Sequence, residues 1–242
     1  MPSNVIIDDD AIVGRRIAVS EMDNNVYLLT SKRTGAQVLI DAADEPEAIM
    51  ELLGEASGDA EEPHLDLIVT THSHWDHIRA LGEIVARTEA TTAAGVEDRP
   101  AIEREVGCQV DWPLAQGDVL AVSEPFAPGG ARWNLIERGA PTSADLTLDV
   151  IGLSGHTPGS VALAYTPADG SAPHLFTGDS LFPGGVGNTD GDRARFASLL
   201  SDVRDRLFGV YPDATIVHPG HGTATTLGVE RPHLDEWKER GW

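Results

Sequence analysis

Short apolar runs bounded by turn residues dominate the first third of the chain. Such runs, rich in β-branched residues and flanked by Gly, Asp or Asn, are typical of strands in a sheet. We therefore expect strands at Ile17–Ser20, Val26–Thr30, Gln37–Asp41 and Leu65–Thr70. Helical spacing of apolar residues instead predicts helices at Pro46–Leu53 and at Asp76–Arg87.

The same mixture continues in the second half of the chain. Apolar runs predict strands at Leu146–Leu153, Val161–Tyr165, His174–Thr177 and Thr215–Val217. Helical spacing predicts helices at Arg193–Phe208 and Pro232–Glu239. Residues 125–139 lack clear periodicity and carry turn residues, which predicts a loop or insertion. No repeat or long linker interrupts the pattern, so residues 1–242 are expected to form one domain.

Composition narrows the class of protein. A hydrophobic share of 41% is ordinary for a globular chain, and no apolar stretch approaches the length of about 18 residues typical of a membrane span. The N-terminal residues MPSNVIIDDD are acidic where a secretory signal would be basic and then apolar, which favours the cytoplasm. A net charge of −22 disfavours nucleic acid and anionic membranes as partners. The oligomeric state is left open.

Cys108 is the single cysteine. One cysteine excludes a disulfide within the chain and a zinc site built from several thiolates. The surrounding residues EVGCQVDW offer no basic group that would stabilise a thiolate, so a catalytic cysteine is not expected.

The strongest chemical signal directly follows the run Leu65–Thr70. Residues 72–77 read HSHWDH, which places three imidazoles and one carboxylate within six positions. Imidazole and carboxylate together suit zinc, iron or manganese. His72 and His74 are two residues apart and point the same way in an extended segment, whereas Asp76 and His77 lie where a helix is expected to begin. The motif can therefore contribute ligands to two ions.

Three further polar motifs follow predicted strands. His156 lies in GHTPGS, Asp179 in GDSLF, and His218 and His221 in HPGHG. Glycine and proline allow the sharp turns that bring such side chains inward at a sheet edge. An isolated histidine is more often a hydrogen-bonded core residue than a ligand. For this reason His218 is assigned a supporting role, and His64, His174 and His233 are taken as surface or structural residues.

Two neighbouring features have simpler interpretations. Residues 184–191 (GGVGNTDG) lack the Gly-Lys-Ser/Thr ending of a phosphate-binding loop, so a mobile or tightly turned loop beside the site is expected. Trp75 is open to two interpretations, because an aromatic residue between two candidate ligands can line the pocket or serve in packing.

The ordered set HxHxDH, GHTPGS, GDSLF and HPGHG resembles the metallo-β-lactamase superfamily. The resemblance extends to NVYLL at residues 25–29 and VLID at residues 38–41, so it covers nearly the whole chain. It implies an α+β fold, an αββα sandwich of two mixed β-sheets flanked by helices. It also implies two divalent metal ions, with zinc as the first expectation and iron or manganese as alternatives.

The family pattern assigns each ligand. His72, His74 and His156 match the ligands of the first ion, and Asp76, His77 and His221 match those of the second. Asp179 matches the carboxylate that bridges the two ions. Paired divalent ions lower the pKa of a shared water toward neutrality and so supply a nucleophile for carbonyl chemistry. Asp76 is expected to orient that water and is the candidate catalytic residue.

Within the superfamily the motifs most resemble the glyoxalase II group, which implies a thioesterase acting on a small acyl thioester. One departure concerns glutathione, because only about twenty residues follow HPGHG, too few for the helical extension that holds it in that group. Another thiol carrier, such as mycothiol, is therefore an option. A lactonase, a persulfide dioxygenase with one iron, and a β-lactamase-type hydrolase remain as alternatives. The intact second-ion ligands favour hydrolysis over the dioxygenase.

Overall fold

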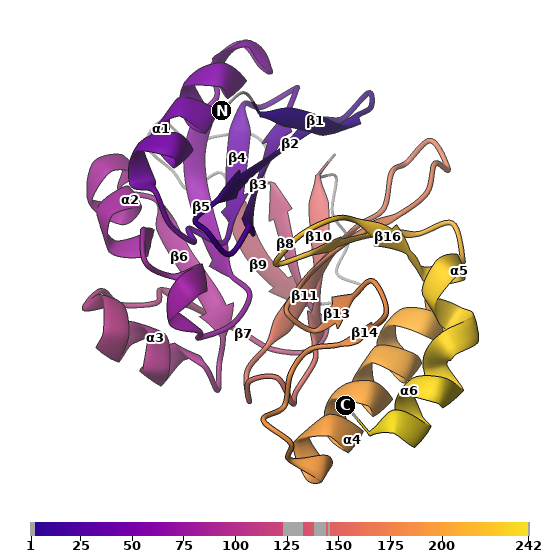
Figure 1. Cartoon of the computed structure of the whole chain (residues 1–242). Helices are drawn as coiled ribbons and strands as arrows, with labels where there is room; N and C mark the ends of the chain where they lie inside the picture. Colours follow the sequence, from indigo (N-terminus) through magenta and orange to yellow (C-terminus); the bar gives the residue numbers. More distant parts are fainter. Residues whose placement is uncertain (1–2, 123–132, 138–143, 145, 242) are drawn as a thin grey trace.

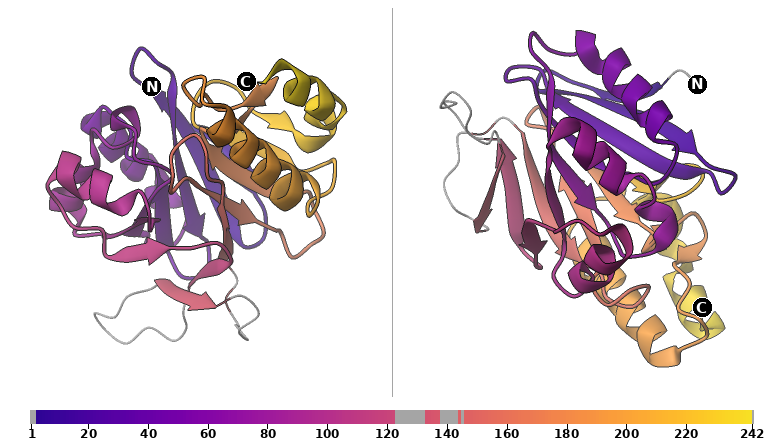
Figure 2. Two further views of the ribbon diagram at one scale, coloured as in Figure 1. Left: turned by 90° about the horizontal axis from the view of Figure 1, so that it is seen from below. Right: turned by 90° about the vertical axis from the view of Figure 1, so that its left-hand side faces the viewer.

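Two β-sheets pack face to face, and helices cover the outer face of each (Figures 1 and 2). This computed structural model describes the chain except residues 1–2, 123–132, 138–143, 145 and 242. The αββα sandwich expected from the sequence is confirmed. In the described part of the chain, no helix has the length and apolar character needed to cross a bilayer.

The first sheet comes from the N-terminal half of the chain. Its strands follow chain order: β1 (Asn4–Asp8), β2 (Ile12–Val19), β3 (Asn24–Ser31), β4 (Ala36–Ile40), β5 (His64–Thr70), β6 (Thr91–Gly95) and β7 (Trp112–Leu114). Pairing is antiparallel from β1 to β4 and parallel from β4 to β7. The outer face carries the helices α1 (Pro46–Glu55), α2 (Leu81–Thr88) and α3 (Arg99–Val106).

The second sheet comes from the C-terminal half. Its spatial order is β16 (Thr225–Thr226), β15 (Ile216–Pro219), β12 (His174–Gly178), β11 (Val161–Tyr165), β10 (Thr147–Gly152), β8 (Asp118–Val122) and β9 (Trp133–Glu137). Only the β12–β15 pair is parallel among these described strands. A small hairpin, β13 (Leu181–Phe182) and β14 (Gly185–Val186), follows β12.

Helices also cover the outer face of the second sheet. They are α4 (Arg193–Asp202), which continues as a π-helical turn at Val203–Phe208, α5 (Leu227–Glu230) and α6 (Leu234–Arg240). Trp237 of α6 is buried and lies beside Phe208, with ring centroids 6.4 Å apart. The residues after HPGHG are therefore part of the sandwich's own helical layer.

Strand alternation explains why so many strands are apolar on both faces. In β11, Val161, Leu163 and Tyr165 join the core between the sheets. Ala162 and Ala164, on the opposite face, join the core beneath the outer helices. Full burial of a leucine side chain stabilises a fold by about 1.5–3 kcal/mol, so the many residues of the inter-sheet core hold the two halves together.

Two predictions about local structure were wrong. The helix expected at Asp76–Arg87 is broken, because a short 3-10 turn at Trp75–His77 ends before α2 begins at Leu81. Residues 125–139, expected as a loop, contain β9, which pairs with β8 and buries Trp133 between the sheets. The remainder of that predicted loop lies outside the described residues. The other predicted strands and helices are confirmed within a few residues at each end, except that the strand expected from Ile17 already begins at Ile12.

The strand directions bring the polar motifs to one edge of the sandwich. In the first sheet, β4 and β5 run parallel and end before Asp41 and Thr71. In the second sheet, β12 runs parallel to β15, and β10 shares the direction of β12 because both pair antiparallel with β11. All these strands therefore end where the candidate metal ligands begin.

Candidate metal centre

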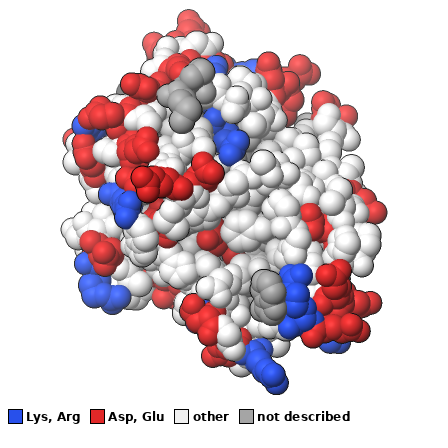
Figure 3. Space-filling view, viewed as in Figure 1, with Lys and Arg blue, Asp and Glu red and all other residues white. Residues whose placement is uncertain are grey.

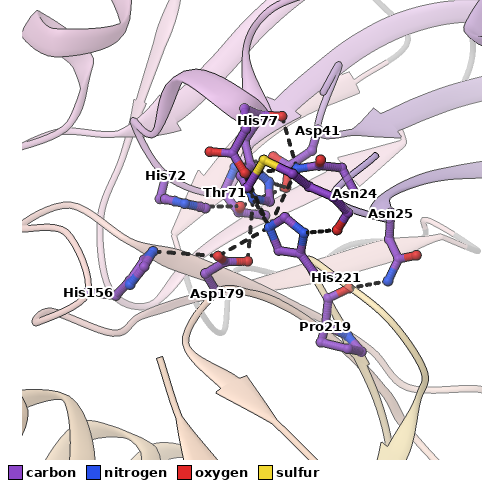
Figure 4. A network of polar contacts seen from close by, with 12 residues as sticks. Asn24, Asn25, Asp41, Thr71, His72, His77, His156, Asp179, Pro219 and His221 are labelled. Atoms are coloured by element: carbon purple, nitrogen blue, oxygen red, sulfur yellow. Dashed lines mark hydrogen bonds and ion pairs between the residues drawn. The ribbon is translucent and has the colours of Figure 1, made fainter. Parts of the chain in front are cut away.

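The seven candidate ligands converge where loops from the two sheets meet. Figure 4 labels His72, His77, His156, Asp179 and His221 among them. The first cluster consists of His72, His74 and His156, whose potential ligand atoms lie within 4.8 Å of one another. Their rings pack closely, with centroids 4.4 Å apart for His74 and His156 and 4.8 Å apart for His72 and His156. HSHWDH from the first sheet thus meets GHTPGS from the second.

The second cluster consists of Asp76, His77 and His221. The Nε2 atoms of His77 and His221 lie 3.1 Å apart. One carboxylate oxygen of Asp76 lies 3.3 Å from His221 Nε2 and 3.6 Å from His77 Nε2. This cluster also joins the two sheets, because His221 follows β15.

Asp179 lies between the two clusters. Its Oδ1 atom is 3.4 Å from His77 Nε2, and its Oδ2 atom is 3.4 Å from His221 Nε2 and 3.7 Å from His156 Nε2. Position 220 in HPGHG has to be glycine, since a Cβ atom there would lie 2.2 Å from Asp179 Oδ1. One carboxylate therefore faces both clusters, as a bridging ligand must.

The outer nitrogen of four histidines is already engaged. His77 Nδ1 lies 2.9 Å from Asp41 Oδ2, and His72 Nδ1 lies 3.1 Å from Thr71 Oγ1. Backbone carbonyls contact the other two: His156 Nδ1 lies 2.7 Å from the Asn188 carbonyl, and His221 Nδ1 lies 2.8 Å from the Met22 carbonyl. Metal-binding histidines commonly use one nitrogen in this way, which fixes the ring and directs the other nitrogen at the ion.

The inward-facing atoms fit a cation. His72 Nε2, His156 Nε2 and Asp179 Oδ1 are buried and have no hydrogen-bond partner among the described residues. Buried polar atoms without partners are costly, whereas imidazole nitrogens and carboxylate oxygens are good ligands for zinc, iron and manganese. The donor set and its geometry therefore match a site for two divalent ions.

The two clusters differ in their protonation. Burial holds the pKa of His72 well below its usual value and lowers the pKa of His156. Burial acts in the same direction on His77 and His221, but the close negative charge of the Asp179 carboxylate outweighs it and raises the pKa of both. Burial would raise the pKa of Asp179, yet the close imidazoles of His221 and His77 hold it well below its usual value. At neutral pH the second cluster thus keeps a proton, whereas His72 and His156 of the first cluster are neutral.

Sequence reasoning missed several residues that hold the ligands. Asn24 is buried, and its side-chain amide donates to Asp76 Oδ2 at 3.0 Å and to the Asp76 carbonyl at 3.1 Å. Asp41 accepts from the backbone and hydroxyl of Thr71 as well as contacting His77. Asn24 begins β3 and Asp41 directly follows β4, two strands that border the site. These positions are the sequence feature that could have indicated their role.

The remaining candidates lie outside the two clusters. His218 pairs with His174, their ring nitrogens 2.9 Å apart and both rings buried, in the structural role expected for each. Exposed His64 and His233 match the surface assignment.

Trp75 is 46% exposed, and the Arg79 guanidinium lies 3.9 Å above its ring, so it packs against a side chain of the next turn. Burial raises the pKa of the Cys108 thiol, which agrees with an unreactive cysteine.

Comparisons with known proteins agree with this geometry. The family model described as the metallo-beta-lactamase superfamily matches residues 19–221. Hydroxyacylglutathione hydrolase GloC of Haemophilus influenzae is 28% identical over 216 residues, covering 89% of this chain and 93% of that protein.

Two solved structures are similar over most of their length. ETHE1 from Myxococcus xanthus has a TM-score of 0.69 and 26% identity, with 93% of this chain and 84% of that chain covered. TTHA1623 in a di-iron-bound form has a TM-score of 0.59 and 30% identity, with 89% of this chain and 96% of that chain covered.

The protonation difference predicts a pH dependence of metal binding. The raised pKa of His77 and His221 means that an ion entering the second cluster must displace a proton, whereas the lowered pKa of His72 and of His156 leaves these two ligands of the first cluster neutral. As the pH is lowered from about 8 to about 6, the zinc affinity of the second cluster should fall about tenfold per pH unit, and that of the first cluster should fall less steeply. Calorimetric zinc titrations in buffers of different ionisation heat measure both quantities. An identical pH slope for both binding steps would contradict the assignment.

Asp179→Ala should weaken metal binding at both clusters, because the carboxylate faces each of them. Activity should fall by at least about a hundredfold, since even changes beyond the ligands commonly cost 10–100-fold. Ser180→Ala is the matched control, because it removes a neighbouring buried hydroxyl that has no hydrogen-bond partner among the described residues. Metal analysis and activity assays on both variants are the measurements. Full retention of both ions by Asp179→Ala would refute the bridging role.

Proposed function

This chain belongs to the metallo-β-lactamase superfamily, and we propose that it is a glyoxalase II-type thioesterase that hydrolyses small acyl thioesters. The proposal assigns the first ion to His72, His74 and His156, the second to Asp76, His77 and His221, and the bridging position to Asp179. The carrying observation is the complete pair of clusters with one carboxylate between them. The similarity to a hydroxyacylglutathione hydrolase over 89% of the chain supports the choice of reaction.

Two divalent ions, when bound, would supply an activated water and polarise a substrate carbonyl. The chain's own contribution is orientation. Asp76 stays ionised, because hydrogen bonds with His221 and Asn24 lower its pKa even though burial opposes this. An ionised Asp76 can accept a proton from the attacking water while Asn24 holds the carboxylate in place.

The leaving group favours a thioester over an amide. A thiol has a pKa of about 8.5, so it departs as a thiolate without being protonated. A departing amine needs a proton, and the outer nitrogens of His77 and His221 are engaged by Asp41 and the Met22 carbonyl. These two imidazoles are thus poorly placed to donate one. Thioester cleavage therefore needs no proton donor for the leaving group, whereas β-lactam cleavage does.

The thiol carrier need not be glutathione. Arg231, in the segment after HPGHG, donates to Asp213 and to the carbonyls of Phe208 and Tyr211. Arg240 donates to the Gly184 carbonyl. Both arginines thus form hydrogen bonds within the helical layer. This supports the expectation that the enzyme has little or no preference for glutathione conjugates over other thioesters. Acidic groups gather toward the margin of the face drawn in Figure 3, around a largely neutral centre. The net charge of −22 supports a small substrate of low negative charge.

The substrate preference can be measured with a short panel. We expect kcat/KM for a simple acyl thioester to exceed that for nitrocefin, with S-lactoylglutathione giving no advantage over the simple thioester. A lactone and a persulfide complete the panel and represent the lactonase and dioxygenase alternatives. The same metal-loaded protein is used for every substrate.

Weak nitrocefin turnover would be compatible with the proposal, because an activated water can attack any accessible carbonyl. Nitrocefin as much the best substrate would refute the thioesterase assignment. Oxygen consumption with the persulfide and no hydrolysis of any ester would also refute it.

A further inference from the structure

A buried carboxylate outside the seven candidate ligands connects the two loops of the first cluster. Asp98 is 1% exposed and lies between β6 and α3, far along the chain from both loops. We propose that Asp98 is the positioning residue of the first metal cluster and fixes the separation of His72 and His74 from His156. The inference rests on the metal binding in the proposed function and not on the choice of substrate.

The hydrogen bonds of Asp98 are directed away from its own helix. Asp98 immediately precedes α3, where an aspartate commonly caps the helix, but its side chain makes no cap hydrogen bond. Its Oδ2 atom instead accepts from the Ser73 amide at 2.8 Å and from the Thr157 hydroxyl at 2.5 Å. Its Oδ1 atom accepts from the Gly159 amide at 2.8 Å. Both carboxylate oxygens are therefore committed to other loops.

These three donors flank the first cluster on both sides. Ser73 lies between the candidate ligands His72 and His74 on the loop of the first sheet. Thr157 directly follows His156 on the loop of the second sheet. One buried carboxylate thus holds the two loops at a fixed distance, and charge-assisted hydrogen bonds of this kind are stronger than neutral ones.

Close packing makes this contact specific. A Cβ atom at Gly159 would lie 2.4 Å from the Asp98 backbone nitrogen, so the second-sheet loop can approach only because this residue is glycine. Ser160 adds a further constraint, because its hydroxyl lies 2.6 Å from the Thr157 hydroxyl and accepts from the Thr157 amide at 3.2 Å. The Thr157 side chain is thereby oriented toward Asp98.

The second cluster is held by different residues. The Asn24 side chain donates to Asp76, and the backbone amide of Asn25 donates to the Gly220 carbonyl at 2.7 Å, on the loop that carries His221. The hydrogen bonds given for Asp98 go to Ser73, Thr157 and Gly159, none of which belongs to this second set. Each cluster therefore has its own link between the sheets, and a change at Asp98 should act on the first cluster selectively.

Asp98→Asn tests the proposal, because it keeps the shape but replaces one accepting oxygen with an NH2 group that faces donors. Zinc affinity of the first cluster should fall about 10–100-fold, and that of the second should change by less than about threefold. Competition titrations of zinc against a chromogenic chelator measure both steps. His156→Ala and His221→Ala, which each remove one cluster's ligand, identify which step belongs to which cluster.

Two further variants control the experiment. Asp111→Asn removes a carboxylate that accepts from the Thr92 amide at 2.9 Å and the Thr92 hydroxyl at 3.0 Å in the same half of the chain, and both zinc affinities should stay unchanged. Thr157→Val removes a single donor to Asp98 and should give a smaller loss at the first cluster. This variant keeps the proposal testable if Asp98→Asn does not fold.

Wild-type affinity at both clusters in Asp98→Asn would overturn the proposal. Equal losses at both clusters, accompanied by a lower unfolding midpoint of the metal-free protein, would also overturn it and indicate a general structural role. A selective loss at the first cluster, in a protein whose wild type hydrolyses no thioester, would refute the thioesterase assignment and support the role of Asp98.

Discussion

Buried imidazole nitrogens and carboxylate oxygens that face a common centre require positive charge between them. In this protein five histidines and two aspartates meet in that way, and three of their inward-facing atoms have no hydrogen-bond partner among the described residues. Isolated buried charges and unpaired polar atoms are among the most costly features that a fold can contain. Without ions, the site meets part of this cost by keeping a proton between His77, His221 and Asp179. Two divalent cations would satisfy the whole set.

The sandwich makes this arrangement possible. The apolar faces of the two sheets pack together, with Leu67 from the first sheet and Leu163 and Phe176 from the second in one continuous core. That packing brings the ends of β4 and β5 opposite the ends of β10, β12 and β15. Ligands that are far apart in the sequence, such as His72 and His221, therefore lie close together in space. Because the ligands span both sheets, metal binding and the packing of the two halves are expected to stabilise each other.

The ligands were predictable from the sequence because each belongs to a short motif at the end of an apolar strand. All seven candidates converge in the structure, although their role as ligands is still a proposal. The residues that hold them were missed, since Asp98 and Asn24 act through contacts with loops distant in sequence. Asp98 reads locally as a helix cap, and only the tertiary structure shows its carboxylate directed elsewhere. The mixed segment between α2 and β10 was likewise missed, because its strands β6, β7 and β8 are short and pair with partners that local periodicity does not reveal.

The most direct measurement is the metal content of protein purified without chelator. Elemental analysis should give two divalent ions per chain, because each cluster offers three ligands and Asp179 faces both. The similarity to a structure solved in a di-iron-bound form agrees with a dinuclear site and leaves the metal itself to the measurement. A reproducible value of one ion per chain, with iron as the only metal, would contradict the dinuclear account.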